Sequence, residues 1–183
     1  MRETVRQPPL TLPANLPARV AMTAFEIERF LAKPRVAVLS WIAPKGEVAA
    51  TPIWFRYQDG VFLLHTSHPS PKTRAILKND GVALLIQDTA PPYRYVSVRG
   101  RARILFGRES ARRRYEQDAL RYYGKLTGKL YLRYGEQLVD AQPHAMEEVL
   151  IEVTPTKLVA MNGTAAINGA QLLGLRALRA LGL

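Results

Sequence analysis

Alternation between apolar and polar positions is the dominant pattern in the middle of the chain. From 94 to 104 the even positions, such as Val96 and Val98, are apolar or small, whereas odd positions such as Arg99 and Arg101 are polar. A period of two is typical of a β-strand with one buried and one solvated face. Similar stretches, rich in β-branched and aromatic residues, predict strands at 35–42, 48–57, 61–66, 82–87, 94–105 and 149–153.

Turn signals between these strands indicate how they pair. Pro44-Lys45-Gly46 and Gln58-Asp59-Gly60 are short enough to form hairpins, so the flanking strands are expected to be antiparallel. Six mainly antiparallel strands with few helices favour a small closed barrel over a sandwich, because closure removes the sheet edges. The predicted fold class is therefore mainly β with flanking helices, arranged as a six-stranded antiparallel barrel.

Capping signals mark the expected helices. Thr23 can cap a helix that stops at Pro34, and Ser70-Pro71 is typical of an N-cap and a first helical position. The predicted helices cover 23–33, 70–79, 109–138 with breaks at Gly124 and Gly128, and 166–183.

One domain, residues 21–162, is expected to hold the barrel, between an extended N-terminal arm at 1–20 and an apolar and basic helical tail at 163–183. Prolines interrupt every apolar run in the arm, so neither a signal peptide nor a membrane-spanning helix is expected there. The chain has no cysteine, which excludes disulfides, thiolate metal sites and cysteine nucleophiles. A cytoplasmic location is favoured.

The net charge of +11 is concentrated in the third of the chain around 99–133 and favours anionic partners. Tyrosines such as Tyr115 and Tyr122 are interleaved with these cations, as in proteins that bind single-stranded nucleic acid. A basic nucleic-acid-binding protein is therefore an alternative of a different class. It is the less favoured one, because helical spacing makes most of these tyrosines core or dimer contacts.

Residues 65–72, His-Thr-Ser-His-Pro-Ser-Pro-Lys, lie where a predicted strand gives way to a predicted helix. Cations in a first helical turn are disfavoured by the helix dipole, yet the free N–H groups there suit a bound anion. The hydroxyls of Thr66 and Ser70, together with the Lys72 ammonium, would form an oxyanion cradle for a nucleotide-type cofactor. The alternative is a capped surface helix with two solvated cations, Lys72 and Arg74.

The segment 51–56 places a proline inside an apolar strand, which usually marks an edge strand or a bulge. Trp54 and Phe55 alternate, so one can fill the core while the other remains available to stack on a planar ring. Thr51 and Arg56 have opposite parity, so they could serve one site only if a bulge near Pro52 resets the alternation.

Other kinds of site find no support in the sequence. The three histidines, His65, His68 and His144, have neither helical i, i+4 spacing nor a neighbouring carboxylate cluster, so no metal site is expected. No Gly-x-Ser-x-Gly elbow and no Gly-x-Gly-x-x-Gly fingerprint occurs. No dedicated catalytic acid, base or nucleophile is predicted.

Three motifs in order resemble the pyridoxamine 5′-phosphate oxidase-like family of split-barrel flavoproteins, which also includes deazaflavin-dependent reductases. They are Phe30-Leu31-Ala32-Lys33-Pro34-Arg35, the hairpin from Gly46 to Phe55, and the segment 65–72. The resemblance runs from about Thr23 to Leu158. It implies a split-barrel homodimer with two cofactor sites at the subunit interface.

The resemblance also implies where a cofactor would bind. The strand after the first hairpin would line the ring, Arg56 would reach the cofactor tail, and the segment 65–72 would hold the phosphate. Tyr95 matches a position that commonly hydrogen-bonds the ring, where pyridoxamine oxidases proper have glutamine, and Pro71 replaces a frequent phosphate-binding arginine. The departure at Tyr95, together with the lack of a recognisable basic and aromatic C-terminal substrate motif, argues against pyridoxal phosphate synthesis. The expected cofactor-binding residues are Thr51, Pro52, Ile53, Trp54, Arg56, His65, Thr66, Ser70, Lys72 and Tyr95.

The expected function is that of an FMN-binding oxidoreductase that transfers hydride between the cofactor ring and a small organic substrate. The ring carries such chemistry, which agrees with the absence of a catalytic triad. FMN is preferred because its single phosphate matches the small cradle. The alternatives are an F420-dependent reductase, whose longer anionic tail would use more arginines, and a protein that binds the cofactor without turnover.

Overall fold

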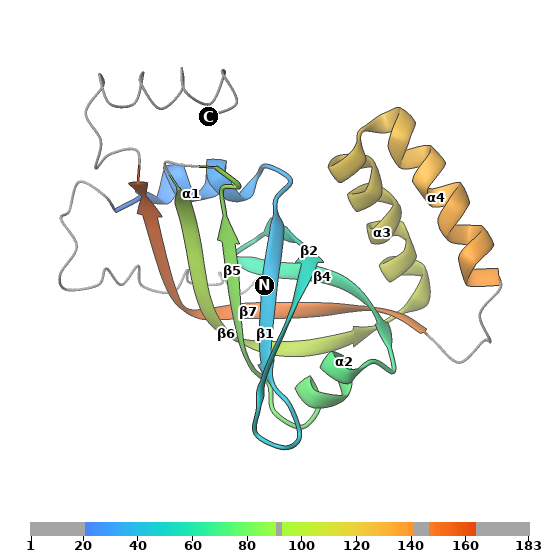
Figure 1. Cartoon of the computed structure of the whole chain (residues 1–183), viewed down its shortest axis with the longest axis horizontal. Helices are drawn as coiled ribbons and strands as arrows, with labels where there is room; N and C mark the ends of the chain where they lie inside the picture. The colour runs from blue at the N-terminus through green and yellow to red at the C-terminus, as the bar shows by residue number, and fades with distance from the viewer. Residues whose placement is uncertain (1–20, 91–92, 141–146, 164–183) are drawn as a thin grey trace, which may run out of the picture.

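The computed structural model describes residues 21–90, 93–140 and 147–163 (Figure 1). The expected arm at 1–20 and nearly all of the expected tail at 163–183 lie outside this part of the chain. The helices are α1 (Ala24–Leu31), α2 (Pro71–Ile76), α3 (Arg108–Tyr123) and α4 (Lys125–Asp140). The strands are β1 (Val36–Ile42), β2 (Val48–Trp54), β3 (Arg56–Gln58), β4 (Val61–His68), β5 (Gly81–Gln87), β6 (Arg94–Phe106) and β7 (Glu147–Asn162).

The strands form one sheet in the order β2-β1-β5-β6-β7-β4-β3, and every neighbouring pair is antiparallel. The sheet curls into a half-barrel with α1 at one end and α3 and α4 at the other side (Figure 1). The predicted mainly β split barrel with flanking helices is thus confirmed. Seven strands replace the expected six because the stretch 48–57 breaks at Phe55, where the chain crosses from one sheet edge to the other.

The barrel core follows from the alternation in the sequence. In β6 the side chains of Val96, Val98 and Ala102 are buried, whereas Arg99 and Arg101 are exposed, as predicted. Both predicted hairpins are present, since β1 pairs with β2 and β3 with β4. Pro52 lies on the edge strand β2, which agrees with the missing backbone donor of proline.

Strand β7 is much longer than the expected 149–153, because the sheet accommodates a proline at an irregularity. The register between β6 and β7 shifts between Arg99 and Gly100, opposite Lys157 and Pro155. The intervening Thr156 donates its hydroxyl to the carbonyl of Arg99 at 3.1 Å. A bulge is one of the few places where a strand tolerates proline, so the sequence signal for a stop is overridden.

Helices α3 and α4 separate at Gly124, whose φ of +80° favours glycine, as predicted. The second expected break, at Gly128, is absent. A Cβ atom at Gly128 would lie 2.9 Å from the carbonyl oxygen of Ala119. Gly128 therefore permits close packing of α4 on α3, instead of ending a helix. No helix in the described part of the chain is long and apolar enough to cross a membrane.

Candidate functional site

The turn from β4 into α2 contains the predicted N-cap, Ser70, whose hydroxyl is hydrogen-bonded within the turn. Ser70 forms a capping box with Thr73: the Thr73 amide donates to Ser70 Oγ at 3.4 Å, and the Ser70 amide donates to Thr73 Oγ1 at 2.9 Å. Both side chains are buried. Ser70 thus orders the turn, and its hydroxyl does not project freely toward a ligand. Thr73, which the sequence interpretation overlooked, is its partner.

Lys72 is the cation that this turn holds in place. Its side chain is half-buried and has no acidic partner among the described residues. Burial lowers its pKa below the ordinary value. Helix α2 has only six residues, so its dipole is small and the ammonium itself is the main attraction for an anion.

His65 faces away from the barrel core toward α3. Its ring lies 4.6 Å from that of Tyr115, centroid to centroid. Desolvation lowers the pKa of His65 to about 4, with a further contribution from the Lys72 charge and an opposing one from Asp118. The imidazole is therefore neutral near pH 7, and its buried Nε2 has no hydrogen-bond partner in the described structure.

Thr66 points to the other face of the same strand. It is buried with Phe62 and Leu64, the even positions of β4 that line the core. His65 and Thr66 therefore cannot present their side chains to one face of the sheet.

A bulge near Pro52, which a site shared by Thr51 and Arg56 would require, is absent. The register between β1 and β2 runs without a shift from Val36 opposite Trp54 to Ile42 opposite Val48. Thr51 and Ile53 share the more buried face of β2, while Pro52 is exposed on the other. Because Arg56 contacts α3 on the opposite side from the core, the structure does not bring Thr51 and Arg56 together.

Trp54 and Phe55 divide the two roles expected of them. Phe55 is fully buried in the core. Trp54 lies against α3 and α4, with its ring stacked at 4.9 Å on Tyr122 and at 6.3 Å on Tyr115, and with two further tyrosines beside it, Tyr123 and Tyr131. In this structure the tyrosines occupy the stacking surface that was predicted to be available for a planar ring.

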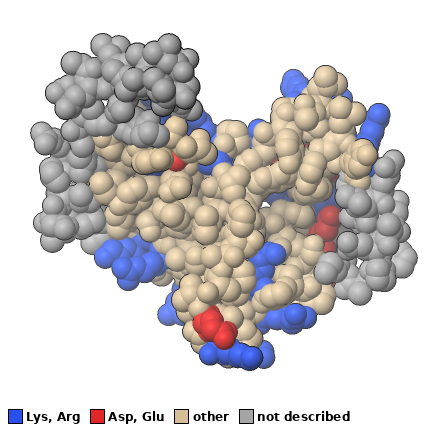
Figure 2. All heavy atoms as spheres, viewed as in Figure 1, with Lys and Arg blue, Asp and Glu red and all other residues tan. Residues whose placement is uncertain are grey.

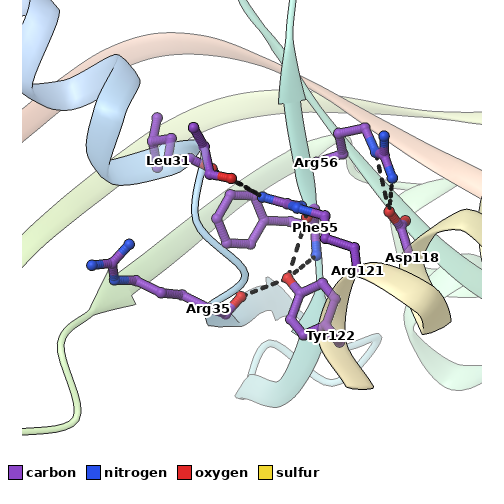
Figure 3. A network of polar contacts seen from close by, with 8 residues as sticks. Leu31, Arg35, Phe55, Arg56, Asp118, Arg121 and Tyr122 are labelled. Carbon is purple, nitrogen blue, oxygen red and sulfur yellow. Dashed lines mark hydrogen bonds and ion pairs between the residues drawn. The ribbon is translucent and has the colours of Figure 1, made fainter. Parts of the chain in front are cut away.

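Helix α3 fixes the point where the chain crosses between the sheet edges (Figure 3). The Tyr122 hydroxyl accepts from the Phe55 amide at 3.1 Å and donates to the Arg35 carbonyl at 2.6 Å. Arg121 donates to the carbonyl of Phe55 at 2.7 Å and to that of Ala32 at 2.9 Å. Burial raises the pKa of Tyr122, so its hydroxyl keeps the proton that it donates.

An ion pair next to this crossing joins β3 to α3. Arg56 donates from Nη2 and Nε to Asp118 Oδ1 at 2.6 and 3.1 Å (Figure 3). The sequence interpretation missed Asp118. The spacing of Tyr115, Asp118 and Tyr122 at i, i+3 and i+7 places all three on one helix face and could have identified it. Arg56 is thus paired within the chain.

Tyr95 lies apart from the other predicted site residues. It is near the start of β6 and donates its hydroxyl to Met161 Sδ at 2.7 Å. The segment that follows helix α2 meets the second half of β6, where the Asp80 carbonyl accepts from the Ala102 amide. Seven residues of strand, about 23 Å, separate Tyr95 from Ala102. Within one chain the structure does not bring Tyr95 and Lys72 together.

The surface is hollowed between the barrel and the lobe formed by α3 and α4, with both acidic and basic atoms at the rim (Figure 2). The Lys72 charge acts on His65, which lies against Tyr115 of α3, and the two residues offer an ammonium and a neutral imidazole. Such a set can bind an anion and exchange hydrogen bonds. The described residues contain no group of histidines and carboxylates that could hold a metal ion.

Much of the basic stretch that suggested a nucleic-acid partner is engaged within the chain. Arg101 pairs with Asp80 and Arg103 with Glu152, while Arg121 binds backbone carbonyls. The tyrosines of α3 pack around Trp54, in agreement with the expectation that most of them are structural.

Comparison with known families matches residues 24–162 to the family described as pyridoxamine 5′-phosphate oxidase. Among solved structures, a protein described as an F420 reductase is 28% identical, with a TM-score of 0.56, and the match covers 72% of this chain and 94% of that chain. A conserved hypothetical protein from Mycobacterium tuberculosis is 23% identical, with a TM-score of 0.66, and 86% and 99% of the two chains are covered.

General Stress Protein 26 from Bacillus anthracis is 20% identical, with a TM-score of 0.53, and 74% of this chain and 90% of that chain are covered. The last two similarities support the fold alone. A comparison with curated proteins finds no match.

Proposed function

Because the chain belongs to the pyridoxamine 5′-phosphate oxidase family, we propose that it is an oxidoreductase that binds a flavin-type cofactor and reduces or oxidises a small organic molecule. Lys72 is the observation that carries this proposal. A half-buried ammonium without an acidic partner is unfavourable, and a cofactor phosphate would offset that cost. When bound, the cofactor ring supplies the hydride chemistry.

Each predicted site residue has a defined role in this proposal. Lys72 holds the phosphate, and Ser70 orders the turn that presents it. Strand β2 lines the cofactor ring, with Pro52 on its exposed face and with Thr51 and Ile53 through their backbone groups, and Thr66 supports the end of β4. His65, neutral near pH 7, exchanges a hydrogen bond without adding charge. Arg56 and Trp54, both occupied by contacts with α3, act by fixing β2 and β3.

We propose that the protein works as a homodimer. The outer face of β1, β2 and β5 exposes Val36, Val38, Ile42, Val48 and Leu85. An apolar sheet face of this kind is typical of a buried interface. A second copy could also bring its Tyr95 to the site, which the Tyr95 of the same chain does not reach.

FMN is the first candidate cofactor, because one phosphate matches the half-buried ammonium of Lys72 at the start of α2. F420 is the second, and the 28% identity to a protein described as an F420 reductase favours it. The F420 tail carries more negative charge than FMN, so its binding would recruit further cations and weaken more steeply as salt is added.

The absorbance spectrum of the purified protein, with mass identification of any released chromophore, tests the proposal. Titration of protein free of chromophore with FMN and with F420, each at low and high ionic strength, then separates the two. Tight binding of FMN with little salt dependence supports the first candidate. Binding of F420 alone supports the second, and binding of neither at micromolar concentration would refute a cofactor-dependent oxidoreductase.

A further inference from the structure

A second concave site lies where α1 covers the end of the barrel, and the proposed cofactor site makes no use of it. The pocket has a volume of about 190 Å³. The start of β6 and the end of β7 meet there, since Arg94 is paired with Asn162. Its lining residues include Glu26, Arg29, Phe30, Lys33, Arg35 and Arg94.

Positive charge exceeds negative charge in this pocket. Arg29 and Lys33 on α1 and its C-terminal extension form no ion pair with a described residue. Arg35 is engaged within the chain through each of its three nitrogens, because it donates from Nε and Nη2 to Asp88 and from Nη1 to the carbonyl of Phe30. Two free cations on one wall favour an anionic ligand.

Arg94 provides a directional donor beside them. Only its Nε binds Asp88, at 2.7 Å, so its two terminal nitrogens have no partner in the described structure. Its guanidinium lies 5.5 Å from the centre of the buried Phe30 ring. The guanidinium of Arg35 packs on the same ring, at 3.8 Å from its centre. These contacts hold Arg94 in place, and an ordered guanidinium can bind a carboxylate or phosphate through two hydrogen bonds.

The acidic residue of the pocket, Glu26, is hydrogen-bonded at the start of α1. Glu26 Oε2 accepts from the amide of Thr23 at 2.8 Å and from its hydroxyl at 3.0 Å, in the capping box of α1. These hydrogen bonds lower the pKa of Glu26, which stays charged. Its carboxylate would repel a ligand that is negative throughout, and would accept from an N–H or O–H group elsewhere on the ligand.

We propose that this pocket binds a small molecule through a carboxylate or phosphate group, which is held by Arg94 and attracted by Arg29 and Lys33. The site is separate from the β4–α2 turn of the same chain. Arg94 lies at the start of β6, whereas the segment that follows α2 contacts the second half of β6, where the Ala102 amide donates to the Asp80 carbonyl. It supplies the protein with a binding site for an organic acid or phosphorylated compound besides its cofactor.

Isothermal titration with inorganic phosphate and with succinate, at constant ionic strength, tests the site and distinguishes the two anion types. The Lys72→Ala variant serves as the background, so that phosphate bound at the β4–α2 turn does not contribute. We expect saturable binding of at least one anion. The double change Arg29→Gln and Lys33→Gln should weaken it at least about tenfold, and Arg94→Lys should weaken it as well, because lysine lacks the two-pronged geometry.

The matched control is Lys45→Gln with Arg99→Gln, which removes two exposed cations away from the pocket and leaves the affinity unchanged. Equal losses in the two double variants would show general charge attraction and overturn the proposal, as would no saturable binding of either anion. Cofactor affinity, measured separately with Lys72 intact, should be the same in Arg29→Gln/Lys33→Gln as in the original protein.

Discussion

Asp118 Oδ1 lies 2.6 Å from Nη2 of Arg56, and this ion pair ties α3 to the short strand β3. The Asp118 side chain is 1% exposed and that of Arg56 is 26% exposed. The second carboxylate oxygen of Asp118 is buried and has no hydrogen-bond partner in the described structure. Among the described residues, Arg56 is therefore the only side chain that hydrogen-bonds to the Asp118 carboxylate.

Replacement of Arg56 by glutamine should destabilise the fold by about 2–3 kcal/mol. The loss is smaller than for a fully buried pair because water reaches part of Arg56. Urea unfolding followed by circular dichroism measures it. The control is Arg101→Gln, which breaks an exposed pair with Asp80 and should cost less than about 1 kcal/mol. Similar losses of stability in the two variants would show that burial does not strengthen the Arg56–Asp118 ion pair relative to an exposed one.

The Tyr122 hydroxyl is expected to stabilise the crossing at Phe55. Tyr122→Phe keeps the ring that stacks on Trp54 but leaves the Phe55 amide and the Arg35 carbonyl without their partner. The expected cost is about 1–3 kcal/mol in the free energy of unfolding. Tyr134→Phe, on a largely exposed side chain, provides the comparison and should change stability little. A Tyr122→Phe protein as stable as this control would contradict the assigned role.

Local features of the fold could be predicted from the sequence because they depend on neighbours in the chain. The caps at Thr23 and Ser70 and the alternation in β6 belong to this class. The long strand β7 could not be predicted, since the bulge that accommodates Pro155 requires the facing residues of β6.

The site was only partly predictable for the same reason. The segment around Lys72 was identified from its sequence, whereas the pair of Arg56 with Asp118 joins residues 62 positions apart. Trp54 was expected to be available for a ligand. Nothing local indicates that tyrosines from α3 and α4 cover it, because the packing of those helices is decided by tertiary contacts.

His65 should make stability depend on pH. Its folded pKa of about 4 is below the unfolded value of 6.5, so the unfolded chain binds more protons between these values. The stabilisation is complete above pH 6.5 and is lost as pH falls toward 4, by up to about 1.4 kcal/mol per unit. Urea unfolding at pH 7 and pH 4.5 measures the difference. The His65→Gln variant should show a smaller difference in stability between the two pH values, and the His68→Gln variant should show the full difference. The reverse result would show that His65 is not the source of the pH dependence.

The apolar outer face of the sheet should form the dimer interface. Light scattering of the protein should give a mass near twice 20.5 kDa. Val38 lies in the central part of this face and its side chain is partly exposed, so Val38→Lys should yield a folded monomer. Leu126→Lys introduces the same charge at an exposed position of α4 and should leave the dimer intact. Dissociation by Leu126→Lys alone would move the interface to α4.

Lys72 should contribute more to cofactor binding than any exposed lysine nearby. The change Lys72→Ala removes a charge-assisted hydrogen bond to the cofactor phosphate, worth about 1.5–3 kcal/mol, or a roughly ten- to hundredfold higher Kd. Lys78→Ala, just beyond the end of α2, removes an exposed lysine and should change the Kd little.

The pH dependence of binding gives an independent measurement on the same residue. Burial lowers the pKa of Lys72, so its ammonium loses a proton at a lower pH than an exposed lysine does. The affinity for FMN or F420, measured by fluorescence quenching, should therefore decline on the alkaline side in the original protein and stay flat there in Lys72→Ala. Equal affinities for the Lys72→Ala and Lys78→Ala proteins, with the same alkaline decline in both, would place the phosphate site elsewhere in the chain.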